Sequence, residues 1–130
     1  MIFSFALLFK AMWTGLAGAF GAGSRHTVSQ ISRRRFGKFF PAGTLFINLT
    51  GALLIGIVSA LFIRFHQYAI WHAPVVLGFI GGYTTFSTCM LEISALRVAG
   101  SRRRITLYIM LSAVLGPLFA YIGLLAGRYM

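Results

Sequence analysis

The sequence predicts an all-α membrane protein that crosses the bilayer four times. Three observations lead to this fold class. Hydrophobic residues make up 58% of the chain and charged residues only 10%, whereas soluble domains carry about a quarter charged residues. Four apolar segments are each long enough to span a bilayer as a helix, which takes about 20 residues. The basic residues gather between these segments, and 130 residues suit one transmembrane domain over residues 1–130.

The first predicted span covers residues 2–31. Its apolar part is too long for the core of a signal peptide, so we interpret it as a membrane helix. Small residues recur along it at spacings of three to four and predict a smooth face where another helix can pack closely. These residues are Gly15, Gly18, Ala19, Ala22 and Gly23. Arg25 follows in the same segment, shortly before its end.

The second predicted span covers residues 43–65 and contains one amide side chain, Asn48. An amide inside a membrane needs a hydrogen-bond partner, and Asn48 has two N–H groups to donate. From the residues alone, Asn48 either bonds a neighbouring helix or belongs to a functional site. The loop that follows, residues 66–73, carries little charge. Its ring side chains are typical of an interfacial aromatic belt rather than of a metal site (His66, Tyr68, Trp71 and His72).

The third predicted span, residues 74–97, contains a stretch that disfavours a helix. From Gly78 to Glu92 it reads Gly-Phe-Ile-Gly-Gly-Tyr-Thr-Thr-Phe-Ser-Thr-Cys-Met-Leu-Glu. Gly81 and Gly82 lower helix stability relative to alanine, and the hydroxyls that follow can bond the backbone locally. We therefore predict a break near mid-membrane at residues 81–85. Irregular backbone at that depth must be buried in protein or line a polar path, so the break indicates a site.

The fourth predicted span covers residues 105–127. Tyr108, Ser112 and Gly116 share one helix face, because they are spaced four residues apart. Two of them carry hydroxyls, which either line a polar track or bond a neighbouring helix. Glu92, in the third span, is the only acidic residue of the chain. A lone carboxyl group inside a membrane indicates a functional site.

The basic residues are distributed unequally between the two sides of the membrane. The chain has twelve Lys and Arg against one acidic residue, which gives a net charge of +11. Three of the twelve face one side (Lys10, Arg64 and Arg128), and nine face the other (Arg25, Arg33, Arg34, Arg35, Lys38, Arg97, Arg102, Arg103 and Arg104). Because cytoplasmic loops collect positive charge, this bias predicts that the two basic loops are cytoplasmic and both termini are outside.

Taken together, the motifs resemble those of the small bacterial fluoride channels, the Fluc/CrcB family. The run Gly81-Gly82-Tyr83-Thr84-Thr85-Phe86-Ser87-Thr88, with Glu92 after it, is similar to the third-helix signature of that family. Gly43-Thr44-Leu45-Phe46-Ile47-Asn48-Leu49 is similar to the second-helix motif, and the glycine-rich segment ending in Arg25 to the first. The third-helix run is specific to the family. The other two motifs are weaker, but they follow one another along the chain in the family's order. The resemblance covers all four spans.

This resemblance implies a passive fluoride-selective ion channel of the bacterial cell membrane that exports fluoride, confers fluoride resistance and is not an enzyme. Its implied partners are fluoride, membrane lipid and a second, inverted subunit, with no nucleic acid. That subunit is either a copy of this chain or a homologue, and the antiparallel dimer holds two pores. Backbone carbonyls of Gly81 and Thr84 would hold a structural sodium ion. The implied pore and anion-binding residues are Asn48, Phe86, Ser87, Thr88, Tyr108, Ser112, Arg25 and Glu92.

The resemblance also suggests roles for individual side chains. Asn48 would donate to fluoride from its amide, Phe86 would present the positive edge of its ring, and Arg25 would attract anions at the pore mouth. Three roles for Glu92 stay open: a proton shuttle, an ion contact, or a hydrogen bond to Thr88 one turn away. A half-helix N-terminus at the break would also favour anions.

Two positions depart from the family pattern. Cys89 stands where the family usually has a second aromatic residue, three positions after Phe86. A thiol has no ring quadrupole, so we interpret Cys89 as a small buried hydrophobic residue. Gly116 stands where several members carry another hydroxyl, which predicts a shorter polar track.

Two other classes of protein fit a short four-helix membrane chain. A small multidrug exporter couples to protons through a glutamate in its first helix, whereas the first span here contains no acidic residue. A non-transporting assembly subunit would have no reason to break a helix at mid-membrane.

Overall fold

A computed structural model describes residues 2–37 and 40–130, and all regular structure within them is helical. Four helical segments are long and apolar enough to cross a membrane: Phe5–Phe36, Ala42–Arg64, Ala73–Val98 and Arg102–Tyr129. The prediction of an all-α protein with four membrane-crossing segments is therefore confirmed at this level. Lys38, which was assigned to the first basic loop, lies outside the described residues.

The first long helix, α1 (Ile2–Phe36), is continuous over 35 residues. It runs past the predicted end of the first span at residue 31, because the basic residues that follow are good helix formers. Gly37 ends the helix: it has a φ of 69° and its N–H donates to the carbonyl of Arg33 at 3.1 Å. Glycine is favoured in this left-handed position because it has no Cβ. Where the bilayer surface falls along α1 stays a prediction.

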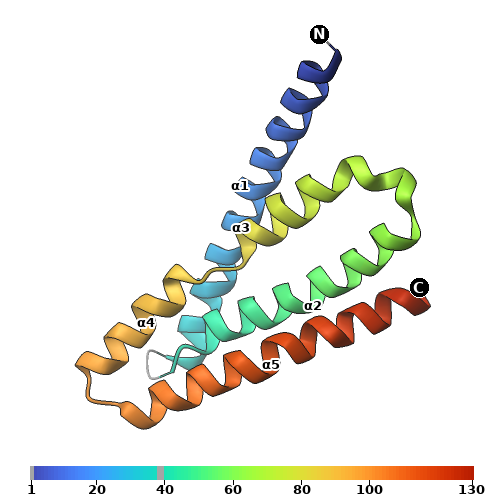
Figure 1. Ribbon diagram of the computed structural model, residues 1–130. Coiled ribbons are helices and arrows are strands. Elements are labelled where there is room, and N and C mark those ends of the chain that lie inside the picture. Colours follow the sequence, from blue (N-terminus) through green and yellow to red (C-terminus); the bar gives the residue numbers. More distant parts are fainter. Residues whose placement is uncertain (1, 38–39) are drawn as a thin grey trace.

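Two further long helices, α2 (Ala42–Arg64) and α5 (Arg102–Tyr129), lie side by side (Figure 1). Glycines let their backbones approach closely. A Cβ on Gly56 would collide with the carbonyl of Ala120, and a Cβ on Gly123 would collide with the carbonyl of Leu53. Such close contact is the usual way in which membrane helices associate, since burial of apolar surface gives little gain in lipid.

The third crossing consists of η2 (Ala73–Ile80), which is a π-helix, then α3 (Gly81–Tyr83) and α4 (Ser87–Val98). α1 packs across η2 and α3 (Figure 1). Gly18, which belongs to the small-residue face predicted on α1, lies in this contact. A Cβ added to Gly18 would be 3.7 Å from the carbonyl oxygen of Gly78. Gly15 and Gly23 face open space, and the tightest approach is instead at Gly21.

The irregular backbone of the third crossing lies later than the sequence predicted. We placed it at residues 81–85, but Gly81 is helical, with φ −62° and ψ −38°, and α3 continues to Tyr83. The non-helical residues are 84–86, and Thr84 is extended, with ψ 158°. The glycines have a packing role: a Cβ on Gly82 would collide with the carbonyl of Gly18 in α1.

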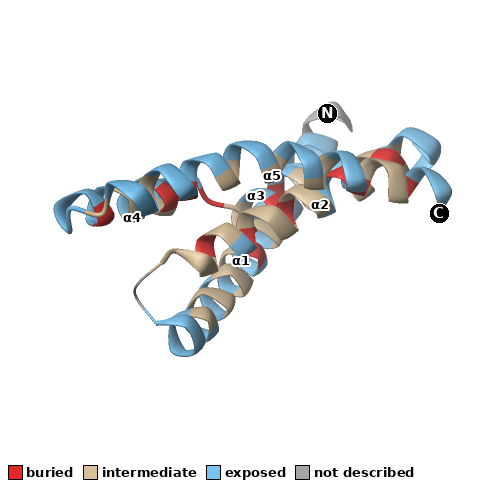
Figure 2. Ribbon diagram, turned by 90° about the horizontal axis from the view of Figure 1, so that it is seen from below, coloured by how far each residue is buried: buried red, intermediate tan, exposed pale blue. Residues whose placement is uncertain are grey.

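A short 3₁₀ helix, η1 (His66–Trp71), joins α2 to η2 at the end of the molecule that lies away from α4 (Figure 1). The ring of Trp71 packs edge-on against Trp13 and Phe9 of α1, with centroids 6.0 and 6.3 Å apart. Figure 2 shows that the buried residues follow the faces where helices meet, whereas the outward faces are exposed. The exposed faces are rich in large apolar side chains, as expected of surfaces that contact lipid or another subunit.

Candidate functional site

Glu92 is the meeting point of three helices. It projects from α4 and accepts two hydrogen bonds: the Thr44 hydroxyl of α2 donates to Oε1 at 2.8 Å, and the Tyr108 hydroxyl of α5 donates to Oε2 at 3.3 Å. Thr44 is 2% exposed and Tyr108 is fully buried. The only acidic side chain of the protein is thus held in a fixed orientation between α2 and α5.

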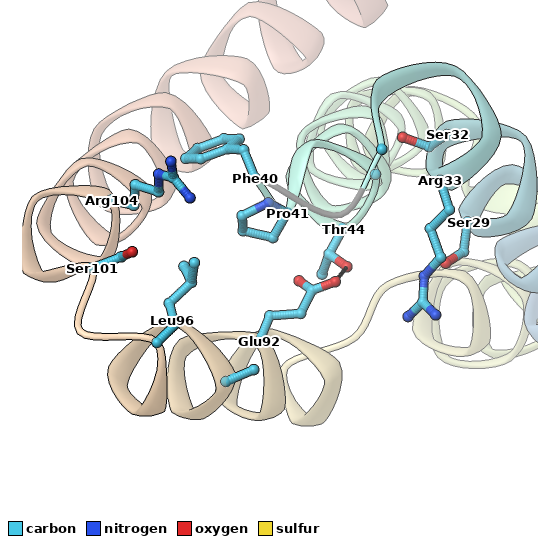
Figure 3. A pocket seen from close by; sticks show the side chains of 14 residues that line it. Ser29, Ser32, Arg33, Phe40, Pro41, Thr44, Glu92, Leu96, Ser101 and Arg104 are labelled. Atoms are coloured by element: carbon cyan, nitrogen blue, oxygen red, sulfur yellow. Dashed lines mark hydrogen bonds between the residues drawn. The ribbon is translucent and has the colours of Figure 1, made fainter.

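A cavity of about 550 Å³ opens beside this carboxyl group. Figure 3 shows Glu92 and Thr44 pointing toward one another, with Arg33 of α1 and Arg104 of α5 on either side of them. Phe40 and Pro41, which precede α2, form part of the wall. The cavity therefore combines two guanidinium groups with a single carboxyl group, so its walls carry an excess of positive charge.

The amide of Asn48 forms a two-sided clamp on the non-helical residues of the third crossing. Its Nδ2 donates to the carbonyl of Thr85 at 2.9 Å, and its Oδ1 accepts from the N–H of Thr85 at 2.9 Å. Thr85 is 8% exposed. The clamp uses the carbonyl of the amide and one of its two N–H groups, so one N–H group is left for another acceptor.

The hydroxyl of Thr85, which lies two residues before α4, bonds the first turn of that helix. It accepts from the N–H of Thr88 at 3.2 Å. It also contacts the hydroxyls of Ser87 and Thr88, at 3.2 and 3.1 Å. A second cavity, of about 250 Å³, lies against this cluster and is lined by Arg25, His26, Arg33, Thr44, Thr85 and Thr88 among others. Thr44 and Arg33 line both cavities, so the two adjoin.

The structure brings together some of the predicted pore residues and separates others. Arg25 and Thr88 line the second cavity, Glu92 lines the first, and Tyr108 bonds Glu92. Phe86, by contrast, is 74% exposed on the outside of the subunit. Ser112 lies one helical turn after Tyr108 on α5 and is half-buried. The oxygens of Glu92 accept from Thr44 and Tyr108, whereas the hydroxyl and N–H of Thr88 bond the Thr85 hydroxyl, so the role of Glu92 stays a prediction.

Two backbone carbonyls near the clamp have lost the donors that a continuous helix would give them. The N–H of Thr85 would bond the carbonyl of Gly81, but it donates to Asn48. The N–H of Thr88 would bond the carbonyl of Thr84, but it donates to the Thr85 hydroxyl. A guanidinium N–H of Arg25 lies 3.5 Å from the Thr84 carbonyl oxygen. Carbonyl oxygens of this kind suit a guanidinium group or a hard cation.

Comparison with known proteins places this arrangement in a family. The sequence pattern of the family described as "CrcB-like protein, Camphor Resistance (CrcB)" matches residues 12–124. The chain belongs to the CrcB family. The match covers the second and third membrane-crossing segments and most of the first and fourth, with all residues of both cavities and of the clamp.

Several relatives of this CrcB chain are named fluoride-specific ion channel FluC. One from Acidobacterium capsulatum is 40% identical over 122 residues, which cover 92% of this chain and 96% of the relative. One from Coxiella burnetii is 38% identical over 112 residues, 83% of this chain and 90% of the relative. One from Methylococcus capsulatus is 43% identical over 114 residues, 87% of this chain, and there the match spans only 50% of the relative's own length.

Sequence reasoning missed two members of the CrcB site. Thr44 was treated only as part of a motif, although it is four residues before Asn48 and must therefore share its helix face. Arg33 was assigned to a loop, whereas it lies on α1 and lines both cavities. Cys89 was interpreted as a small buried residue, and this is confirmed, since its thiol is free and it is 8% exposed.

The hydrogen bond from Thr44 to Glu92 should stabilise the packing of α2 against α4. We expect Thr44→Val to lower the free energy of unfolding by about 1–3 kcal/mol, because a half-buried carboxyl oxygen loses its donor. Urea unfolding in detergent micelles measures this change. The matched control is Thr27→Val, whose exposed hydroxyl donates only to its own helix, to the Gly23 carbonyl at 3.1 Å. That variant should change stability by less than about 0.5 kcal/mol, and equal losses in the two variants would contradict the assignment.

Proposed function

We propose that this chain is the subunit of a passive, fluoride-selective channel that lets fluoride leave the cytoplasm. The observation that carries the proposal is that relatives named fluoride-specific ion channels match almost the whole chain, two of them over 90% or more of their own length. The polar cluster around Asn48, Thr85 and Glu92 supports the proposal, since it gathers hydrogen-bond donors inside a bundle whose outward faces are apolar.

Fluoride is small and strongly hydrated, so a pore must replace its water with N–H and O–H donors. The amide of Asn48 has one N–H group beyond the clamp, and the hydroxyl of Thr88, which accepts from the Thr85 hydroxyl, has its own O–H left to donate. Ser87 and Ser112 would add hydroxyls, and Tyr108 would do so if it turned from Glu92. Each of these contacts is a single hydrogen bond, which is weak enough to let an ion move on.

Positive charge near the two cavities would select for anions. Arg25, Arg33 and Arg104 line one or both of them, against the single carboxyl group of Glu92. A cavity with an excess of one sign of charge raises the local concentration of the opposite ion. In this scheme Glu92 is held away from the anion by Thr44 and Tyr108, which bond both of its oxygens.

The proposed channel is an antiparallel dimer with two pores, built with a second subunit in the inverted orientation. The exposure of Phe86 supports this assembly. A ring that is 74% exposed in one subunit can present its positive edge to an ion only if another surface covers it. The second subunit would form that surface, so that each pore takes residues from both chains.

We further propose a structural sodium ion between the two subunits. The chemistry of the site fits, because Gly81 and Thr84 both have carbonyls whose helical donors bond elsewhere, and Gly81 lies on an exposed face. The backbone oxygens of these two residues would hold the ion, whose charge would offset the dipoles of the carbonyls. The Arg25 guanidinium beside the Thr84 oxygen also offsets part of the partial negative charge on that oxygen.

The alternative of a proton-coupled multidrug exporter gains no support from the site. Its acidic residue would be expected in the first helix, whereas α1 contains none and the sole carboxyl group lies on α4. A passive channel needs no proton coupling. Fluoride release without a proton gradient separates the two functions.

The proposed pore predicts a specific effect at Phe86. Liposomes containing the purified protein should release fluoride but not chloride, without a proton gradient, as followed with ion-selective electrodes. Phe86→Ile should slow the release by up to about tenfold, because the ring edge contributes on the order of 1 kcal/mol to the passing anion. The matched control is Phe20→Ile, on α1, where the ring is 73% exposed. Chloride release at the fluoride rate, or an equal loss in both variants, would refute the pore.

The charge bias predicts how this chain inserts. Nine basic residues face one side and three the other, so one orientation, with both termini outside, should predominate. Either a homologue of opposite bias then supplies the inverted subunit, or the chain inserts less one-sidedly than this count implies and pairs with itself.

Labelling of single cysteines tests this orientation. In a Cys89→Ala background, Arg103→Cys should be protected from an impermeant maleimide in right-side-out vesicles, and Gln67→Cys should react. Both native residues are exposed, so accessibility within the subunit is matched. Partial and equal labelling of both positions would show instead that the chain inserts both ways and pairs with itself.

A further inference from the structure

The third crossing is interrupted by side chains that capture backbone N–H groups. In a continuous α-helix each N–H bonds the carbonyl four residues earlier. Here the N–H of Thr85 donates to Asn48 Oδ1 at 2.9 Å, and the N–H of Thr88 donates to Thr85 Oγ1 at 3.2 Å. On either side the helical pattern is intact: the N–H of Thr84 still donates to Ile80, and that of Met90 to Phe86.

Inside a membrane these captures are energetically significant. A backbone N–H without a partner is strongly unfavourable in an apolar medium, so the chain leaves a helix only where another acceptor replaces the lost carbonyl. Asn48 and the Thr85 hydroxyl are those acceptors. The Nδ2 group of Asn48 satisfies the Thr85 carbonyl as well, at 2.9 Å, so Thr85 is held through both of its backbone groups.

The two captures free two carbonyls, those of Gly81 and Thr84, from helical hydrogen bonding, and a guanidinium N–H of Arg25 lies 3.5 Å from the Thr84 oxygen instead. The neighbouring glycines do not account for this release, because Gly81 has helical φ and ψ angles and Gly82 lies in α3. Gly82 is needed for another reason, the close approach of Gly18 in α1. The helix therefore ends where side-chain acceptors are available, and not at the residues with the lowest helix propensity.

We propose that Asn48 and Thr85 are positioning residues, which keep the carbonyls of Gly81 and Thr84 out of helical hydrogen bonding and so available to a cation. Asn48 would then act on the backbone in addition to its proposed contact with fluoride. This inference rests on the proposed channel and its sodium ion. It gives the Thr85 hydroxyl a positioning role that is part of neither the proposed fluoride pore nor the proposed set of sodium ligands.

The test compares Thr85→Val with Thr85→Ser in the full-length protein. Valine has nearly the shape of threonine but no hydroxyl, so the N–H of Thr88 would return to the Thr84 carbonyl. Serine keeps the acceptor and should preserve the wild-type behaviour. Thr106→Val is the matched control, because its exposed hydroxyl donates only within α5, to the Arg102 carbonyl at 3.2 Å.

The first readout is the Tm in sodium chloride and in N-methyl-D-glucamine chloride. Wild type, Thr85→Ser and Thr106→Val should all be stabilised by sodium, whereas Thr85→Val should lose most of that increment. A purely structural role would lower the Tm of Thr85→Val equally in both salts. If Thr85→Val does not assemble, Thr85→Ala, which is smaller and also lacks the hydroxyl, is measured in its place.

The second readout is fluoride release from liposomes. It should fall at least about tenfold in Thr85→Val, and stay near the wild-type rate in Thr85→Ser, because a misplaced binding group commonly costs this much or more. Sodium-dependent stability and fluoride release that are both unchanged in Thr85→Val would overturn the positioning role. Wild-type protein that releases no fluoride would instead refute the proposed function, so the two failures are distinguishable.

Discussion

The paired hydrogen bonds between the Asn48 amide and the backbone of Thr85 hold the structure together at its least regular point. They tie α2 to the residues between α3 and α4, and each is 2.9 Å long. In lipid an irregular segment persists only if its N–H and carbonyl groups find partners, and one side chain supplies both of these. The direction in which α4 leaves the third crossing, and with it the position of Glu92, follows from this contact.

Glycine and hydroxyl residues have separate tasks in this chain. Gly21 and Gly82 at one crossing, and Gly56 and Gly123 at the other, let helix backbones touch where a Cβ would collide. Hydroxyl groups instead direct the chain, since the Thr85 hydroxyl bonds the first turn of α4 while the Thr44 hydroxyl orients Glu92. A low helix propensity therefore marks close packing as readily as it marks the end of a helix, and only tertiary contacts decide between them.

The fold was predictable from the sequence because apolar length determines it. Four segments of sufficient length, with basic residues between them, require four helices, and the structure has them. The site was less predictable. Asn48 was recognised as an amide that needs a partner, but its partner is backbone 37 positions away, which no local pattern encodes. The irregular residues were placed at the glycines, since propensity was the only available signal, whereas acceptors on α2 fix them at residues 84–86.

The backbone conformation of Thr84 in a lipid bilayer tests this account most directly. Solid-state NMR of protein labelled with ¹³C-threonine reports it through the Cα and Cβ chemical shifts, with Thr44 and Thr50 of α2 as helical references in the same spectrum. Thr84 should show extended shifts, as its ψ of 158° requires, and these should convert to helical shifts when Asn48 is replaced by leucine. Helical shifts for Thr84 in the unaltered protein would contradict this account.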